Sequence, residues 1–196
     1  MITRGTLVAA ALIAALLAAT ARADAPVTHY VSDQAQSTLE FAFSQAGAEN
    51  KGKFTRFPVK LDFSPDNLGG SRLEVTVDMN SLDTGDKERD DTLRGAELFN
   101  VAKFPQAHFL ATQFAKTANG YEASGKLTIR DATRDARVPF TWRTAGTAGA
   151  PFASMDGRIT VKRLDYGVGQ GEWKATDQVG NDVLVHFTVR LTPAAQ

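Results

Sequence analysis

NSLDTGDKERDDTLRGAELFNVAKFP, residues Asn80–Pro105, is the one long stretch of this chain whose pattern predicts helix. Asp83 or Thr84 can cap its start, because aspartate and threonine side chains accept hydrogen bonds from the free N–H groups of a first turn. Gly95 fits the position just past the end of a helix. Beyond residues 1–23, the rest of the chain predicts short strands and tight turns, so this stretch is a helical insertion in an all-β chain.

The strand pattern is clearest in Ser37–Ser44. Leu39, Phe41 and Phe43 fall on one face of this segment, and a period of two is typical of a half-buried strand. The same reasoning predicts strands within residues 28–31, 57–63, 73–79, 107–111, 123–129, 138–142, 155–164 and 183–191. Turns or loops are expected at 65–70, 119–120, 131–134, 146–151 and the glycine-rich 166–181.

About eight strands, each apolar on one side, have to bring those sides together. An antiparallel sandwich and a closed barrel both achieve this, and closure also removes the edges of the sheet. A barrel of about eight strands can enclose one ligand when small side chains line part of its interior. The inward faces mix phenylalanines with Ala107, Ala111, Ala123 and Gly125. That mixture fits a cavity and fits a filled core as well.

Residues 1–23 have the features of a cleavable secretory signal peptide. Arg4 supplies the positive charge, and Leu7–Ala19 is an apolar run too short for a comfortable membrane span. Small residues flank Arg22, so we expect the cut after Ala23 and a mature domain of residues 24–196. An uncleaved membrane anchor is the alternative.

Charge and cysteine content exclude several classes of function. The chain has 22 lysines and arginines, 22 aspartates and glutamates, and no cysteine. A balanced charge without a basic run gives no support for nucleic-acid binding. The lack of cysteine excludes a disulfide framework, a thiolate metal site and a lipid-modified cysteine anchor. A cysteine-free exported domain fits the bacterial periplasm.

No group of residues predicts a catalytic or metal site. His29, His108 and His186 are far apart and have no metal-ligand spacing. Gly167–Gly171 looks like a dinucleotide-binding loop only superficially, because no helix follows it. Acidic neighbours such as Asp90-Asp91 are explained by surface charge. We therefore expect a protein that is not an enzyme and holds no metal.

Three motifs are similar to signatures of the YceI-like polyisoprenoid-binding family. The first lies within residues 81–105 and reads S-x-D-T-G, then R-D-x-x-L-R, then F-N-V-x-x-F-P. The second is Gly125–Arg130 and the third is Arg163–Gly169. Their order and spacing agree with the family over nearly the whole chain. Gln170–Trp173 is similar to a branch often found beside, or fused to, b-type cytochromes of the membrane.

The resemblance implies an extended, lipocalin-like, eight-stranded antiparallel β-barrel with a short helical segment at about residues 85–104. It implies an apolar tunnel that holds a polyisoprenoid, such as a ubiquinone-like isoprenoid quinone or a polyprenyl lipid, with no covalent cofactor. It also implies a periplasmic carrier, with a membrane b-type cytochrome as a candidate partner and with transient membrane contact and oligomer formation left open. The alternatives are an enzyme acting on a lipid-like substrate and a filled barrel that serves as an interaction module.

Strand phase and the resemblance together give the expected ligand-binding residues. The expected tunnel walls are Leu39, Phe41, Leu61, Phe63, Val75, Val77, Phe109, Leu127, Ile129, Phe140, Trp142, Ile159, Val161, Val185 and Phe187. Ordinary core packing is the alternative for each of them. A hydrocarbon tail forms no directional bonds, and each buried methylene contributes roughly 0.8 kcal/mol. We therefore expect little selectivity for tail length.

The mouth of the tunnel is expected beneath the predicted helix. Phe99 and Phe104 are expected to face the tunnel, while the charged residues of 86–94 face solvent, so that the segment forms a lid. Arg163, Asp165 and Trp173 either bracket a polar head group or hold the glycine-rich loop in place. For Arg163 paired with Asp165 we expect the structural role.

Overall fold

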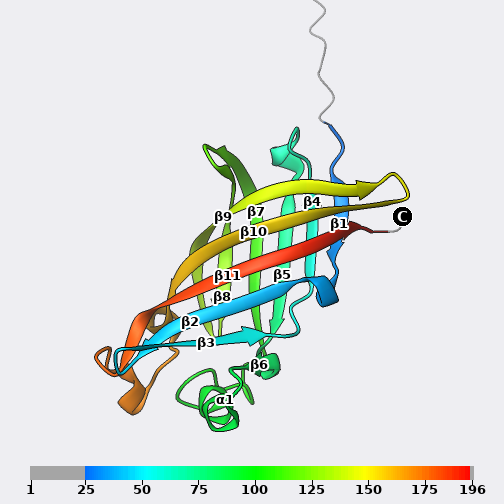
Figure 1. The fold of residues 1–196 in the computed structure, drawn as a ribbon. Coiled ribbons are helices and arrows are strands. Elements are labelled where there is room, and N and C mark those ends of the chain that lie inside the picture. Colours follow the sequence, from blue (N-terminus) through cyan, green and yellow to red (C-terminus); the bar gives the residue numbers. More distant parts are fainter. Residues whose placement is uncertain (1–24, 195–196) are drawn as a thin grey trace, which may run out of the picture.

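The alternating segments form one sheet of eleven strands, and this sheet closes on itself (Figure 1). The structure is a computed structural model that describes residues 25–194. The closed ring contains eight antiparallel strands in the order β1-β4-β5-β7-β8-β9-β10-β11, and β11 pairs again with β1. The predicted all-β barrel with one short helix is therefore confirmed. The expected signal peptide and its cleavage site lie outside the described residues.

The ring strands are β1 (Thr28–Ser32), β4 (Val59–Phe63), β5 (Arg72–Asp78), β7 (Gln106–Thr117), β8 (Gly120–Ile129), β9 (Ala132–Thr147), β10 (Ala150–Lys162) and β11 (Val179–Pro193). The sheet continues from β11 through β2 (Thr38–Gln45), β3 (Ala48–Phe54) and the two-residue β6 (Leu82–Asp83). Helix α1 is Lys87–Arg94, and 3-10 turns occupy Gln34–Gln36, Leu68–Gly70, Met79–Ser81, Arg163–Tyr166 and Gly171–Lys174. No helix within residues 25–194 is long and apolar enough to cross a membrane.

Strand β11 changes its partner along its length. Its first part, 179–188, pairs with β2, and its last part, 191–193, pairs with β1. The 3-10 turn Gln34–Gln36 separates β1 from β2. The wall of the barrel therefore continues past β1 as the β2–β3 hairpin, toward the end where α1 lies (Figure 1).

The sequence pattern does not predict β3. Its sequence, AENKGKF, has no apolar alternation, and most of its side chains are exposed. It is a strand because the hairpin turn Ala46-Gly47, with φ of 48° and 81°, folds it back onto β2. Pairing with β2 and β6 satisfies its backbone, so tertiary context outweighs local pattern here.

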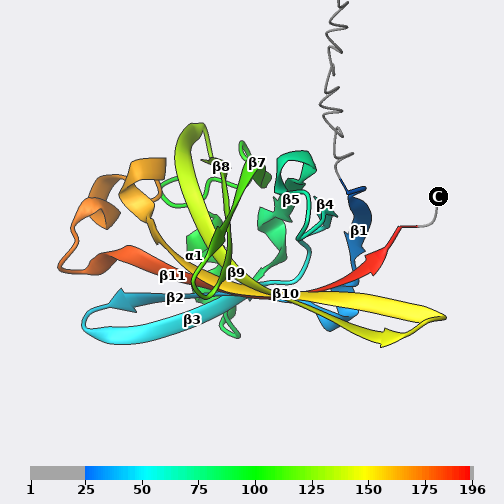
Figure 2. The ribbon, with the colours of Figure 1, turned by 90° about the horizontal axis from the view of Figure 1, so that it is seen from above.

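Two predicted turns are shorter than expected. The expected loop 146–151 reduces to the turn at Ala148-Gly149, and β9 and β10 extend into a two-stranded ribbon that projects beyond the barrel (Figure 2). The turn between β8 and β9 lies at Arg130-Asp131, with Arg130 at φ 55°, rather than over residues 131–134.

The helix is shorter than the stretch that predicts it, and its cap differs. Asp86 is the N-cap and accepts a hydrogen bond from the Arg89 N–H, so the prediction of Asp83 or Thr84 was wrong. Gly85, at φ 74°, turns the chain just before the cap, which explains why the helix cannot begin earlier. Gly95 ends the helix as predicted, but in an extended conformation with φ −62° and ψ 166°.

A cavity at the α1 end of the barrel

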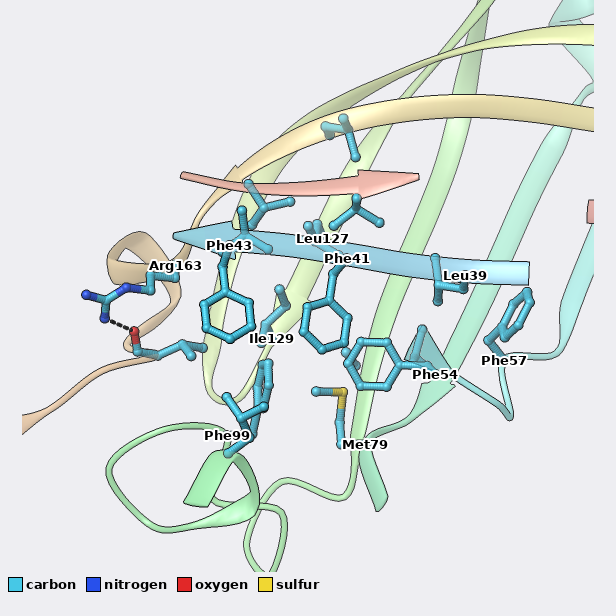
Figure 3. A pocket seen from close by; sticks show the side chains of 18 of the residues that line it. Leu39, Phe41, Phe43, Phe54, Phe57, Met79, Phe99, Leu127, Ile129 and Arg163 are labelled. Atoms are coloured by element: carbon cyan, nitrogen blue, oxygen red, sulfur yellow. Dashed lines mark hydrogen bonds between the residues drawn. The ribbon is translucent and has the colours of Figure 1, made fainter. Parts of the chain in front are cut away.

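The inward faces of the barrel strands enclose a cavity of about 480 Å³ (Figure 3). Every ring strand except β1 contributes to its walls, together with β2, β3 and the segment that contains α1. Because the strands alternate, their polar side chains face outward and the lining is mostly aliphatic and aromatic. A space of this kind has the size and character of a small-molecule site.

Most of the expected tunnel residues line this cavity. They are Leu39, Phe41, Val75, Val77, Phe99, Phe109, Leu127, Ile129, Ile159, Val161, Val185 and Phe187. Strand phase was sufficient to place all of them except Phe99, since each of the others belongs to an alternating run with one apolar face. Phe99 was expected at the mouth, beneath the predicted helix. Their part in binding a ligand stays a prediction.

The other expected residues lie outside the cavity. Leu61, Phe63 and Phe140 are buried in the part of the core farther from α1, and Trp142 packs on Phe63 there with a centroid separation of 4.8 Å. Phe104 lies under the Arg130 guanidinium, 5.5 Å from its ring centroid. Alternation identifies the inward face of a strand, but it does not show where along the strand the interior is hollow.

Some lining residues were missed. Phe43, Phe57 and Val183 share the phase of predicted neighbours, so their sequence signal was present. Phe54 belongs to β3, and the sequence of β3 does not predict a strand. Met79 continues the alternation of the predicted strand 73–79, so its sequence signal was also present, although the structure places it in the 3-10 turn after β5.

Two phenylalanine rings lie against the wall beside glycines rather than across the lumen. Phe41 is paired with Gly52, and a Cβ at Gly52 would come within 2.4 Å of the Phe41 ring. Phe187 is paired with Gly157, where a Cβ would come within 2.6 Å of the Phe187 ring. The missing side chains make room for the rings and so help to keep the cavity open.

The mouth of the cavity is polar. Asp86, Glu88, Arg89 and Thr92 of the α1 segment line it together with Gln45 of β2. Asp86 and Glu88 are exposed, as expected for the charged face of α1, and they also line the opening, whereas Asp90 is buried. The lining thus changes along the cavity, from charged and polar groups at the opening to hydrocarbon in the interior.

The chain just after α1 is fixed to the neighbouring loops. The Glu97 carbonyl accepts hydrogen bonds from the N–H groups of Gly169, at 3.0 Å, and Gln170, at 2.8 Å. The Arg130 Nη1 donates to the carbonyls of Leu98 and Gly167, both at 2.6 Å. Phe99 is therefore held over the cavity by a backbone whose two preceding residues are hydrogen-bonded to neighbouring segments.

Arg163 is buried, and its guanidinium donates only to backbone carbonyls. Its partners are the carbonyl oxygens of Val168 at 2.9 Å, Trp173 at 2.7 Å, Val179 at 2.6 Å and Gly180 at 2.9 Å. Arg163 is among the residues that line the cavity, but Figure 3 shows its guanidinium turned away from the apolar side chains, and burial lowers the pKa of the side chain.

The structural role expected for Arg163 is present, but the expected partner is not. Asp165 is exposed, and among residues 25–194 no carboxylate lies within ion-pair distance of Arg163. The arginine holds the glycine-rich loop through carbonyl groups alone. Trp173, the third residue of that set, lines the cavity.

The acidic and imidazole groups have structural contacts. Asp90 accepts hydrogen bonds from the N–H and hydroxyl of Thr84, at 2.9 and 2.7 Å, and lies 3.8 Å from Arg94. His186 lies on the outer face of β11 between Glu40 and Asp156. Within residues 25–194, no three His, Asp or Glu side chains gather in a way that could hold a metal ion.

The comparisons with known proteins agree with this geometry. The model of the YceI-like domain matches residues 30–191. The chain belongs to the YceI-like family. A relative, a UPF0312 protein of Yersinia pestis, is 31% identical over 132 residues, which cover 65% of this chain and 68% of the relative.

Solved structures of similar fold include Burkholderia cenocepacia BcnA, which is 30% identical with a TM-score of 0.75 and covers 81% of this chain and 98% of its own. A polyisoprenoid-binding domain from Saccharophagus degradans, implicated in plant cell wall breakdown, has a TM-score of 0.62 at 17% identity and covers 84% of this chain and 98% of its own. At that identity, the second likeness shows the fold alone.

Proposed function

We propose that this protein binds an isoprenoid lipid in its cavity and carries or stores it without chemical conversion. The observation that carries the proposal is the cavity of about 480 Å³, with apolar walls and a polar mouth. A branched hydrocarbon tail needs apolar walls and no directional bonds, and each buried methylene contributes roughly 0.8 kcal/mol before ordering costs. The head group then lies at the mouth, beside Gln45 and the charged residues of α1.

The family supports the ligand class. One structure of the same fold is described as a polyisoprenoid-binding domain, and nothing in the cavity favours a ligand held by many hydrogen bonds. Asp90, one of the acidic residues that a lipid-modifying enzyme could use, is already engaged by the N–H and hydroxyl of Thr84. A binding role therefore explains the cavity with fewer assumptions than catalysis.

The proposal extends to place and partner. With the signal peptide expected at residues 1–23, the protein works in the periplasm, where lipids with long tails need a protein to cross water. Gln170–Trp173 is similar to the branch associated with b-type cytochromes, so we propose an isoprenoid quinone as ligand and such a cytochrome as the partner reached during transient membrane contact. Quinone loaded on the protein should then be reduced or oxidised by membranes that contain the cytochrome and not by membranes without it.

Native mass spectrometry of the purified protein, before and after solvent extraction and after addition of a quinone, tests the ligand class. A matched pair of variants sharpens the result. Val77→Asp places a carboxylate on the cavity wall, whereas Val31→Asp makes the same change at an exposed position. We expect Val77→Asp to lose the lipid and Val31→Asp to keep it, with thermal unfolding as a check that both fold. Failure of the wild-type protein to carry or take up any lipid would refute the proposal.

A further inference from the structure

The cavity ends part-way along the strands of the barrel. Along the inward face, lining residues give way to non-lining residues within 59–61 of β4, 109–111 of β7, 138–140 of β9, 153–155 of β10 and 189–191 of β11. The residues just beyond these points are among the most buried in the molecule: Leu61, Ala111, Ala153 and Leu191 are 0% exposed. The interior is thus hollow toward α1 and filled at the other end.

Aromatic rings fill the closed end. Phe63 is at their centre, with ring centroids of Phe114 at 5.8 Å, Tyr121 at 5.2 Å, Phe140 at 5.8 Å and Trp142 at 4.8 Å. Rings at these separations are in contact and leave no space for a chain of methylene groups between them. The cavity therefore has a floor.

The volume above the floor limits how much hydrocarbon can enter. A dry protein cavity of about 150 Å³ holds benzene, so each enclosed carbon takes roughly 25 Å³. At that density, the cavity of about 480 Å³ encloses on the order of 19 carbons. This is a tail of about four five-carbon isoprene units.

We propose that the aromatic floor sets a ceiling on tail length, so that about four isoprene units are enclosed and the rest of a longer tail stays outside the mouth. The inference rests on the proposed function and adds selectivity to it. It replaces the expectation of little selectivity for tail length, which rested on the lack of directional bonds between a hydrocarbon tail and the walls.

Competition between quinones of different tail length, delivered from detergent micelles, tests this limit on tail length. The protein is offered an equimolar mixture of quinones that share the same head group and carry tails of two, four, six or eight isoprene units. Native mass spectrometry then identifies which quinone is bound. Tails that fit should compete about equally, because they exchange one apolar surrounding for another. Each unit beyond the ceiling leaves the micelle for water, which should reduce occupancy by at least about tenfold per unit.

Two variants should change the longest tail that the cavity encloses in opposite directions. Phe140→Ala removes a ring next to lining residue Val138 and should raise the share of the six-unit tail at least about tenfold. Phe114→Ala removes a ring on the far side of the same cluster and should not. Ala136→Leu adds bulk inside the hollow half and should cost the four-unit tail at least about tenfold against the two-unit tail. Ala145→Leu, an exposed position on the same strand, is its control.

The outcomes separate the two proposals. An eight-unit tail that binds wild type as well as a four-unit tail overturns the ceiling and leaves the proposed function standing. No occupancy by any tail overturns both. The Ala136→Leu result decides the matter if Phe140→Ala does not fold, since an unchanged ratio there also overturns the ceiling.

Discussion

Arg163 keeps its charge in the interior by means of four carbonyl groups rather than a carboxylate. Because these carbonyls belong to Val168, Trp173, Val179 and Gly180, one side chain gathers both ends of the loop between β10 and β11. Hydrogen bonds to a charged group are stronger than those between neutral groups. The loop in turn holds the segment after α1, through the Glu97 carbonyl.

Replacing Arg163 by methionine should therefore loosen the mouth. The change keeps apolar length but leaves the carbonyls without their donor, and we expect a loss of about 3 kcal/mol in the free energy of unfolding. Arg158→Met, at an exposed position, should change it by less than about 0.5 kcal/mol. Denaturant unfolding measures both, and equal small losses would show that the guanidinium does not hold the loop.

Asp78 at the end of β5 makes a pH-dependent contact. The Arg56 guanidinium, 2.7 Å from the Asp78 carboxylate, is the main cause that lowers the pKa of that carboxyl, and the Asn80 N–H adds to it. Since the folded-state pKa lies below the unfolded value of about 3.9, the contact stabilises the fold above about pH 4. This contribution is lost as the pH falls through the folded-state pKa.

Asp78→Asn should thus destabilise the protein at pH 7 by up to about 1 kcal/mol, the upper range for a partly exposed ion pair. At a pH below the folded-state pKa the variant and the wild type should unfold alike. Thermal melts at several pH values test this, with exposed Asp66→Asn as control. A destabilisation that does not change with pH would mean that the charge of Asp78 is irrelevant.

At the scale of secondary-structure elements, the sequence predicted those features that depend on nearby residues, namely the apolar face of a strand and the end of the helix. The phase of Leu39 and Phe41 identified a strand face that does line the cavity. Strand β3 and the partner change of β11 depend on contacts between distant segments, so no local pattern could reveal them. The N-cap was predicted at the wrong residue because Asp83, Thr84 and Asp86 can all cap a helix. Only the backbone turn at Gly85 shows that the helix begins after Asp86.

The segment after α1 gives a prediction about lipid retention. Phe99 lines the cavity, and its ring meets Phe54 edge-on at 6.2 Å, whereas Phe104 lies outside under Arg130. Phe99→Asp should weaken lipid retention by at least about tenfold, because it puts a charge on the apolar wall. Its effect on the folding free energy should be smaller, since Phe99 is only half-buried.

Phe104→Asp is the matched control for Phe99→Asp, because it makes the same change in the same segment outside the cavity. Retention is read from the rate at which quinone leaves the protein for empty vesicles, and stability from denaturant unfolding. If Phe99→Asp loses retention and stability in equal measure, the segment is ordinary core and not a cover for the cavity.

The pairing of Gly52 with Phe41 gives a second prediction at this scale. The Cβ added in Gly52→Ala meets the Phe41 ring at 2.4 Å and the Thr84 methyl at 2.9 Å, both of them side chains that can shift. We expect the ring to move into the lumen, so that the protein folds but takes up less lipid. Gly149→Ala, where a Cβ meets nothing within 4 Å, should leave uptake unchanged. Undiminished uptake by Gly52→Ala would show that the ring does not limit the space.

The molecule as a whole combines a filled half and a hollow half on one continuous sheet. In the filled half, aromatic rings around Phe63 pack against nearly inaccessible aliphatic residues, as in an ordinary core. In the hollow half, the same strands face an empty volume and lose the contacts that a filled interior would supply. The filled half therefore supplies stability, and the hollow half keeps the space that a ligand needs.

This division predicts a gradient of local stability. Without lipid, hydrogen exchange should be slow in peptides covering 111–115 and 140–142 of the filled half, and faster in 39–45 and 179–187 of the hollow half, because low local packing allows local opening. Added quinone should slow exchange in 39–45 and 179–187 at least about tenfold, since a ligand at 100 times its Kd stabilises the bound form by about 2.7 kcal/mol and an opening that breaks the cavity releases it. Equal exchange rates in the two halves without lipid would mean that the hollow half is no softer than the rest of the barrel.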